Sequence, residues 1–188
     1  PLATNSKIKV IKMNIFILDD NPKIAATMMV DKHIIKMPLE CMQMISTILD
    51  YLGFSSPYRP VMLLHPCTLW AKKSKQNMQW LVAHHKALCK EYTLRYGKIH
   101  RCQKVFENYE EEINKMIDSL PDKGLTPFAI AINADMLCRQ TVSDFDTLSA
   151  VDKYRLYYLL DKRHIAEWKT EAPKWWLDYD LKENENDR

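Results

Sequence analysis

The pattern of apolar and polar residues between positions 21 and 53 predicts a helix. Asn21 followed by Pro22 is typical of a helix start, and Gly53 is typical of a helix end. Pro38 should break or kink the helix, because proline lacks the N–H and clashes with the preceding turn. The apolar residues recur at the spacing of one helix face, at Ile24, Met28, Ile34, Ile35, Leu39, Met42, Ile45, Ile48, Leu49 and Leu52.

The same periodicity predicts that most of the remaining chain is helical. We expect helices over residues 66–73, 76–96, 99–120 and 149–168, and short helical turns within 128–146. The exception is "NIFIL" at 14–18, whose β-branched and aromatic residues predict an extended segment or a single short strand. The predicted fold class is therefore all-α, a single-domain orthogonal helical bundle with at most a short N-terminal strand.

Three stretches of the chain differ in character. Residues 13–179 are expected to form the helical domain, and the acidic residues 180–188 a frayed tail. Residues 1–12 precede a methionine that is typical of a protein start, so they are read as a native extension or a segment added in cloning. No apolar run approaches the ~20 residues of a membrane span, and no apolar signal-peptide core is present, so we expect a cytoplasmic protein.

The amino-acid composition argues against several folds and several kinds of binding site. The chain has only 3 glycines and neither GxGxxG nor GxxxxGK[ST], which argues against a β-sandwich and against phosphate-cradling loops. Its five cysteines are odd in number and contain no CxxC, so we expect reduced, mostly buried thiols and no zinc site. The net charge of +3 permits nucleic-acid contact without requiring it. We expect neither a metal ion nor another cofactor.

The stretch "VDKHIIKMPLECMQM" at 30–44 contains the first candidate site residues. On a helix, His33, Lys36 and Glu40 lie along one edge, and Asp31 lies further round. These groups are either a solvated stripe beside an apolar face or groups that converge on a ligand. The flanking isoleucines and methionines favour the second interpretation, because a buried charge is costly unless it is paired or used.

A histidine at a predicted helix start is the second candidate. His65 precedes Pro66, and its imidazole could either cap that helix or meet an anion held by free N–H groups. No second histidine lies four residues from His84 or His85, so a helical zinc site is not indicated there.

The most basic tract is residues 80–101, where aromatic side chains interleave with cationic ones. It is either a basic helix face beside core aromatics or a nucleic-acid surface, since phosphates bind cations and bases stack on flat rings. Trp175 and Trp176 either clasp the core or form a base-stacking wall. The residues expected to contact nucleic acid are Lys32, Arg59, Lys72, Lys73, Arg95, Lys98, His100, Arg101, Trp175 and Trp176.

The order of several motifs resembles that of a known enzyme family. "MNIFIL", "DKHxxKMxLE", "YR…HPC…W", "WLVAHHKALCKEYTLRYGK" and "APKWWLDY" follow one another over residues 13–179. This order resembles the phage endonuclease V-type pyrimidine-dimer DNA glycosylases and related uncharacterised phage proteins. The resemblance implies an all-α enzyme that flips out a nucleotide, attacks its sugar with the N-terminal α-amine and cleaves by β-elimination from a Schiff base. A glutamate in the first helix would assist, although Glu40 is expected to lie too far along its helix for that role.

The first functional hypothesis is a DNA-binding phage protein, a glycosylase relative that acts on a flipped or modified base in double-stranded DNA. His33, Lys36 and His65 would line the base pocket, with Glu40 or Asp31 as the acid–base partner. One alternative is a non-catalytic module that binds a host or phage protein complex. A further alternative is an enzyme acting on a free nucleotide. A phage-encoded protein of this kind would work in the host-cell cytoplasm.

Overall fold

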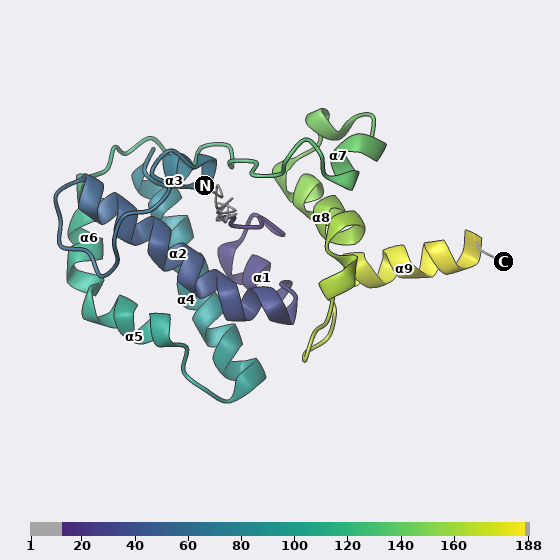
Figure 1. The fold of residues 1–188 in the computed structure, drawn as a ribbon, viewed down its shortest axis with the longest axis horizontal. Helices are drawn as coiled ribbons and strands as arrows, with labels where there is room; N and C mark the ends of the chain where they lie inside the picture. The colour runs from purple at the N-terminus through teal and green to yellow at the C-terminus, as the bar shows by residue number, and fades with distance from the viewer. Residues whose placement is uncertain (1–12, 187–188) are drawn as a thin grey trace, which may run out of the picture.

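The computed structural model describes residues 13–186, and it is all-α (Figure 1). No β-strand forms within this range, so the predicted fold class is confirmed apart from the short strand. The extension at 1–12 lies outside the described residues. The helices are α1 (Pro22–Thr27), α2 (Asp31–Tyr51), α3 (Pro66–Ala71), α4 (Lys75–Tyr96), α5 (Arg101–Asn108), α6 (Glu110–Ser119), α7 (Leu137–Thr141), α8 (Ala150–Asp161) and α9 (Lys174–Asn186), with 3₁₀ turns η1 (Phe145–Thr147) and η2 (Arg163–Ile165).

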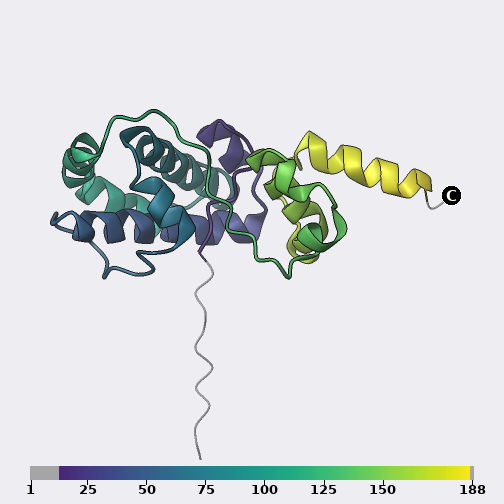
Figure 2. The same cartoon turned by 90° about the horizontal axis from the view of Figure 1, so that it is seen from above.

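The segment from Met13 to Val30 lies between two groups of helices. The long helices α2 and α4 are on one side of it with α5 and α6, and α7, α8 and α9 are on the other (Figures 1 and 2). On the first side, Trp80 Nε1 donates to the carbonyl of Asp20 at 2.7 Å. On the second side, Arg155 of α8 donates to the carbonyl of Leu18 at 3.0 Å. The segment therefore joins the two parts of the molecule.

Residues 14–18, predicted as an extended segment or a single short strand, form an irregular segment without a strand partner among the described residues. The Oδ1 atom of Asn14 accepts hydrogen bonds from the N–H groups of Ile15 and Phe16. Phe16 adopts a positive φ of 55°, and its carbonyl accepts from Leu18 N at 2.9 Å. Because these bonds satisfy the backbone locally, the β-branched residues pack into the core without a strand partner.

Helix α2 continues through Pro38, and the break falls instead at 28–30, before the helix begins. A proline removes one helical N–H donor and is expected to disturb the turn that precedes it. The carbonyl of Ile35, in that turn, accepts a hydrogen bond from His100 Nε2 at 3.1 Å. Tertiary hydrogen bonding and burial of Met37 and Cys41 thus hold the helix together across the proline.

Capping residues explain the ends of α4, which packs against α1 and α2 at the centre of the larger part. Ser74 accepts from Asn77 N at its start, and Gly97, with φ 65°, ends it in the left-handed conformation. The single helix predicted over 99–120 is two helices that meet at Tyr109. The run Glu110–Glu112 opens α6, where negative charge is favourable at a helix N-terminus.

The C-terminal part is shorter and more irregular than predicted. Helix α8 ends at Asp161, not near 168, and a turn follows. The aromatic tail forms α9, which continues through residues 180–186 where a frayed segment was expected. In Figures 1 and 2 this helix projects away from the rest of the molecule.

All five cysteines are free and buried, as the sequence predicts. No helix in the described range 13–186 is long and apolar enough to cross a membrane.

Candidate functional site

A pocket of about 430 Å³ lies where the N-terminal segment meets both parts of the molecule. We call it the α2–α8 pocket. Its residues come from the N-terminal segment, from α2, from the start of α3, from the linker before α7 and from the end of α8. They are Met13, Asn14, Phe16, His33, Lys36, Met62, His65, Pro66, Ile130, Ala131, Ile132, Asn133, Tyr157 and Lys162. The structure thus brings together His33, Lys36 and His65, which are far apart in the sequence.

Glu40 lies directly behind this lining. Its side chain is almost fully buried, with Oε2 accepting from the backbone N–H of Asn14 at 2.9 Å. Its Oε1 is 2.6 Å from Nζ of Lys36, whose side chain is 59 % exposed. The sequence indicated that Glu40 lies too far along its helix to meet the start of the domain, but the N-terminal segment passes beside the third turn of α2, where Glu40 lies. The carboxylate meets the first residues of the described chain.

His33 is held as a neutral ring at the pocket wall. Its Nδ1 hydrogen-bonds the hydroxyl of the buried Tyr158 at 2.5 Å, and its ring stacks on Phe16 at 4.3 Å. Burial lowers the pKa of His33 to about 3, and the charges of Lys162 and Lys36 act in the same direction. The imidazole is therefore uncharged at neutral pH and can offer the pocket a hydrogen bond but not a positive charge.

His65 lies at the start of α3, where the sequence predicted either a helix cap or contact with an anion, and the structure shows the cap. Its Nδ1 accepts from Cys67 N at 3.2 Å and so caps α3, while the side chain also lines the pocket. Because Nδ1 is the acceptor, the proton of the neutral ring is on Nε2. Burial also lowers the pKa of His65. The ring is thus a fixed N–H donor for a ligand.

Several lining residues were not among the predicted site residues. Lys162 follows α8, and Tyr157 lies one turn before its end, so both reach the pocket only through tertiary packing. Asn14 also lines the pocket, and its Nδ2 donates to Ala131 O in the linker at 2.9 Å. The sequence around Lys162 mixes aromatic and basic residues, a pattern that does not place it near α2.

Asp31 and Arg95 do not belong to the site, contrary to the sequence predictions. The Arg95 side chain has no exposed surface and lies 2.9 Å from Asp31 and 2.7 Å from Glu91. It also donates to the carbonyls of Met29 and Thr27. Arg95 therefore ties α4 to the junction between α1 and α2 and cannot contact phosphate, and Asp31 is its partner instead of an acid–base group in the pocket.

Replacing Arg95 with methionine should lower the free energy of unfolding by about 3–5 kcal/mol, because the buried Glu91 is then left without its ion pair and the partly buried Asp31 loses its own. Chemical denaturation measures the loss. Lys86→Met is the matched control on the same helix, because Lys86 is 53 % exposed in its ion pair with Glu110 and such pairs contribute less than about 1 kcal/mol. Equal losses for the two variants would contradict a structural role for Arg95.

Of the other residues predicted to contact phosphate, some are exposed and some already interact with groups of the protein itself. Lys32, Arg59, Lys73, Lys98 and Arg101 are exposed. Lys72 lies over the ring of Tyr51 at 3.9 Å. His100 accepts from Cys102 N with Nδ1 and donates to Ile35 with Nε2, so neither ring nitrogen is free for phosphate.

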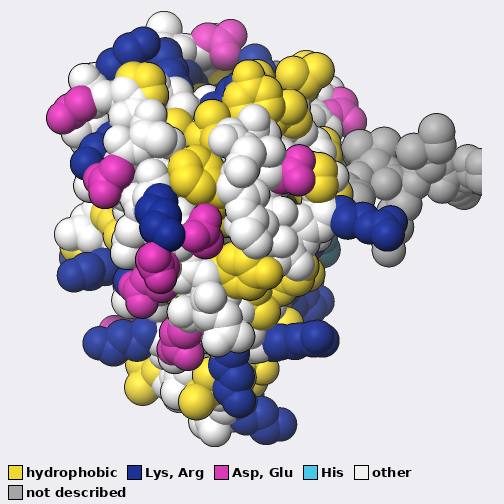
Figure 3. All heavy atoms as spheres, turned by 90° about the vertical axis from the view of Figure 1, so that its left-hand side faces the viewer, with side chains coloured by type: hydrophobic (Ala, Val, Ile, Leu, Met, Phe, Trp, Pro, Cys, Tyr) yellow, Lys and Arg dark blue, Asp and Glu magenta, His cyan; other side chains and the backbone are white. Residues whose placement is uncertain are grey.

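The contact between His100 and Ile35 places the loop before α5 beside α2. Lys98 and Arg101 flank His100, and Lys32 and Lys36 are on the exposed side of α2. Figure 3, by contrast, views the molecule from the side of α5 and α6, where cationic and acidic side chains are interspersed. The exposed cations near α2 are therefore the better candidates for a nucleic-acid surface.

Trp176 is buried and cannot stack on a base. Its ring lies 5.0 Å from that of Trp168 and 6.2 Å from that of Trp175. Trp168 and Trp175 both donate to Met28, the first to the carbonyl and the second to the sulfur. The tryptophans form a clasp between the C-terminal part and the N-terminal segment, which is the structural alternative of the two predicted.

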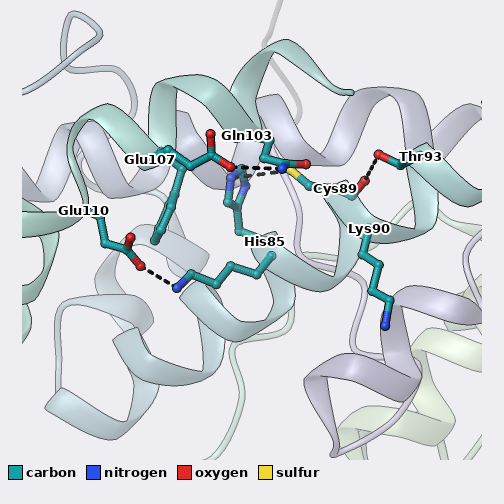
Figure 4. Close-up of a pocket in the computed structure, with 9 residues that line it drawn as sticks. His85, Cys89, Lys90, Thr93, Gln103, Glu107 and Glu110 are labelled. Carbon is teal, nitrogen blue, oxygen red and sulfur yellow. Dashed lines mark hydrogen bonds and ion pairs between the residues drawn. The ribbon is translucent and has the colours of Figure 1, made fainter. Parts of the chain in front are cut away.

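A second cavity, of about 450 Å³, lies between α4 and helices α5 and α6 (Figure 4). His85 and Cys89 lie close together there, with Cys89 Sγ 3.6 Å from His85 Nε2. Burial lowers the pKa of His85 to about 3 and raises that of Cys89 to about 12, so neither is charged at neutral pH. Lys86 is paired with Glu110. The predicted site residues His33, Lys36 and His65 line the α2–α8 pocket and not this cavity, so we take the α2–α8 pocket as the candidate site.

No group of three or more His, Cys, Asp or Glu residues in the described range is arranged to hold a metal ion.

Part of the chain matches a known family. Residues 13–104 match the family model of pyrimidine dimer DNA glycosylases, which confirms the resemblance over that stretch. The searches of curated proteins and of solved structures found no match. The matched stretch contains the N-terminal segment, His33, Lys36, Glu40 and His65. The linker residues, Tyr157 and Lys162 lie beyond it, so the pocket is completed by a part of the chain that the family model does not cover.

Proposed function

We propose that this chain is a DNA glycosylase that takes one flipped nucleotide of damaged duplex DNA into the α2–α8 pocket. The observation that carries the proposal is the contact between the Glu40 carboxylate and the backbone N–H of Asn14 at 2.9 Å, within the stretch that matches the glycosylase family. The resemblance implies an assisting glutamate in the first helix, and Glu40 of α2 is a candidate for that role because it contacts the N-terminal segment.

The size and lining of the pocket suit a nucleotide. Its volume of about 430 Å³ is within the range of small-molecule sites. The buried rings of Phe16 and Tyr157 lie in its wall, 6.1 Å apart and nearly parallel. His65 supplies an N–H donor, and Asn14 and Asn133 supply amide groups for the edge of a base.

Glu40 is suited to stabilise positive charge as the glycosidic bond breaks. The bond between C1′ and the base is weakened as positive charge develops on the sugar, and a desolvated carboxylate stabilises that charge.

A base-release assay tests the function. Duplexes that contain a pyrimidine dimer, another modified base or no damage are incubated with the full chain. We expect cleavage of the glycosidic bond in the dimer-containing duplex and none in the undamaged one. If folded protein releases no base from any of these duplexes, the proposal fails. DNA binding without release would favour a binding module, and release from a free nucleotide alone would favour the nucleotide enzyme.

DNA binding should depend on salt through the exposed cations beside α2. Replacing both Lys98 and Arg101 with alanine should lower the slope of log K against log salt by about two, because each phosphate contact contributes about one. Fluorescence anisotropy at several salt concentrations gives the slope. Lys115→Ala is the control, since Lys115 lies on α6 and is paired with Glu111 and Glu112. Affinity that does not change with salt would exclude phosphate-driven binding.

A further inference from the structure

Leu64 is the most exposed of the large apolar residues in the described part of the chain, at 80 %. It lies between two residues that line the α2–α8 pocket, Met62 and His65. A single exposed leucine is ordinary on a protein surface, so its exposure alone indicates nothing. Its place is the unusual feature, because it puts an apolar side chain at the rim of the candidate site.

The turn that carries Leu64 is fixed by hydrogen bonds at both of its ends. Towards α2, Oγ1 of the buried Thr47 accepts from Val61 N at 2.9 Å and lies 3.0 Å from Val61 O. Towards α3, His65 N donates to the carbonyl of Met62 at 2.9 Å, and the His65 ring caps the helix. The leucine therefore lies on a short turn whose backbone is held against two helices.

The backbone of this turn also has a conformation that residues other than glycine rarely adopt. Met62 has a φ of 51°, and bulky residues avoid positive φ because the side chain approaches the backbone. Such a conformation costs free energy, and residues that keep it are concentrated at ligand-binding sites. Met62 is itself part of the pocket lining. The two observations together favour a turn that is shaped for a ligand.

Exposed cationic side chains near the turn indicate the kind of ligand that approaches it. Lys36 lines the same pocket, and its side chain is 59 % exposed although its Nζ contacts Glu40. Arg59 is exposed in the loop that carries Leu64. Phosphate oxygens are the usual partners of such groups when a protein binds DNA. Charge complementarity therefore favours a nucleic-acid ligand over an uncharged apolar surface of another protein.

We propose that Leu64 inserts into the base stack of duplex DNA and occupies the space left by the nucleotide that enters the α2–α8 pocket. The inference rests on the proposed glycosylase function and deepens it, because it names a residue that keeps the flipped nucleotide from returning. Flipping requires the target to unstack and unpair, which costs free energy. Apolar side chains such as leucine wedge between base steps in proteins that deform DNA. Leu64 suits this role because its turn is already ordered before DNA binds.

The fluorescence of 2-aminopurine measures the insertion, because this base becomes brighter when it loses its stacking neighbours. The probe is placed next to the dimer in a duplex, and the full chain is titrated onto it. We expect the fluorescence to rise on binding, and Leu64→Ala to remove most of the rise at saturating protein. Leu181→Ala is the matched control, because Leu181 is 64 % exposed on α9, which projects away from the rest of the molecule. An equal rise with Leu64→Ala, or no rise with the unaltered chain at saturation, would overturn the inference.

The rate of base release gives a second measurement. Leu64→Ala should slow single-turnover release from the fully paired dimer duplex by about tenfold, because less of the DNA is held in the flipped state. Abasic nucleotides opposite the dimer lower the cost of unpairing and should restore most of the lost rate. Leu64→Met keeps a long apolar side chain and should retain both the rate and the fluorescence rise.

The two measurements separate this inference from the proposed function. An equal loss of rate on the paired and unpaired duplexes would overturn the role of Leu64 and leave the glycosylase proposal standing. A fluorescence rise that depends on Leu64, without base release from any duplex, would refute only the glycosylase proposal.

Discussion

Replacing Glu40 with glutamine is expected to slow base release from a dimer-containing duplex by about 10²- to 10³-fold. Glutamine has the same shape and can still accept the Asn14 N–H, which the Glu40 carboxylate now accepts at 2.9 Å. It cannot carry the negative charge that stabilises the developing positive charge on the sugar, and it leaves Lys36 without its partner. The effect should appear in the single-turnover rate, with little change in DNA affinity.

Glu91→Gln is the matched control for this variant. Glu91 is also a buried helical carboxylate in an ion pair, with Arg95 at 2.7 Å, but it lies outside the pocket. We expect this variant to be less stable and to retain the single-turnover rate of the folded protein. If Glu40→Gln keeps its rate within about twofold while remaining folded, Glu40 has no role in the chemistry.

Acidification should destabilise the protein steeply below about pH 6.5. Burial lowers the pKa values of His33, His84 and His85 to about 3, 4 and 3. The unfolded chain binds a proton at each ring near pH 6.5, whereas the folded chain does not, so the unfolded state binds more protons as the pH falls. The stability contributed by these rings is complete above pH 6.5 and is lost towards pH 3–4.

The expected loss is large. Each group contributes up to about 1.4 kcal/mol per pH unit, or about 4 kcal/mol for the three together. Between pH 6.5 and pH 4 the loss reaches about 10 kcal/mol, so a domain in the lower half of the ordinary stability range of about 5–15 kcal/mol would unfold before pH 4. Urea denaturation at pH 7.5, 6 and 5 measures the slope, and equal stability at these three values would contradict the prediction.

A substitution can assign this slope to particular residues. His84→Asn should reduce it by about a third, because the asparagine amide can still donate to the Pro22 carbonyl, which His84 Nδ1 contacts at 2.8 Å, without binding a proton. His164 is exposed, so His164→Asn should leave the slope unchanged. A slope that is the same in both variants would show that His84 is not among the groups responsible.

Local chemistry made much of the fold predictable. The starts of α1 and α4 and the end of α4 follow from Asn21, Ser74 and Gly97, whose effects depend only on nearby backbone groups. The effect of Pro38 was mispredicted because the helix is supported there by His100, which is distant in the sequence. The break at Tyr109 had a signal in the three glutamates that follow it, but continuous apolar spacing concealed it.

The site was only partly predictable for the same reason. His33, Lys36 and Glu40 share a helix edge, so their proximity follows from spacing alone, and the structure adds His65 through the packing of α3 on α2. Charge alone misassigned Arg95, because a buried arginine with two carboxylate partners has the same sequence pattern as one that meets phosphate. Lys162 and Tyr157 required knowledge of how α8 docks, which no local pattern contains.

The α2–α8 pocket lies where the N-terminal segment meets both parts of the molecule, so ligand binding is linked to the contact between those parts. Phe16 belongs to the N-terminal segment and Tyr157 to α8. The hydrogen bond from Trp168 to Met28 also links the N-terminal segment to the C-terminal part. A ligand that contacts both rings adds a further interaction between the two parts, so part of its binding free energy opposes their local separation. Conversely, local loosening of the contacts between the two parts would move the pocket residues apart before any helix unfolded. Activity would then be lost on warming at a lower temperature than the global unfolding transition.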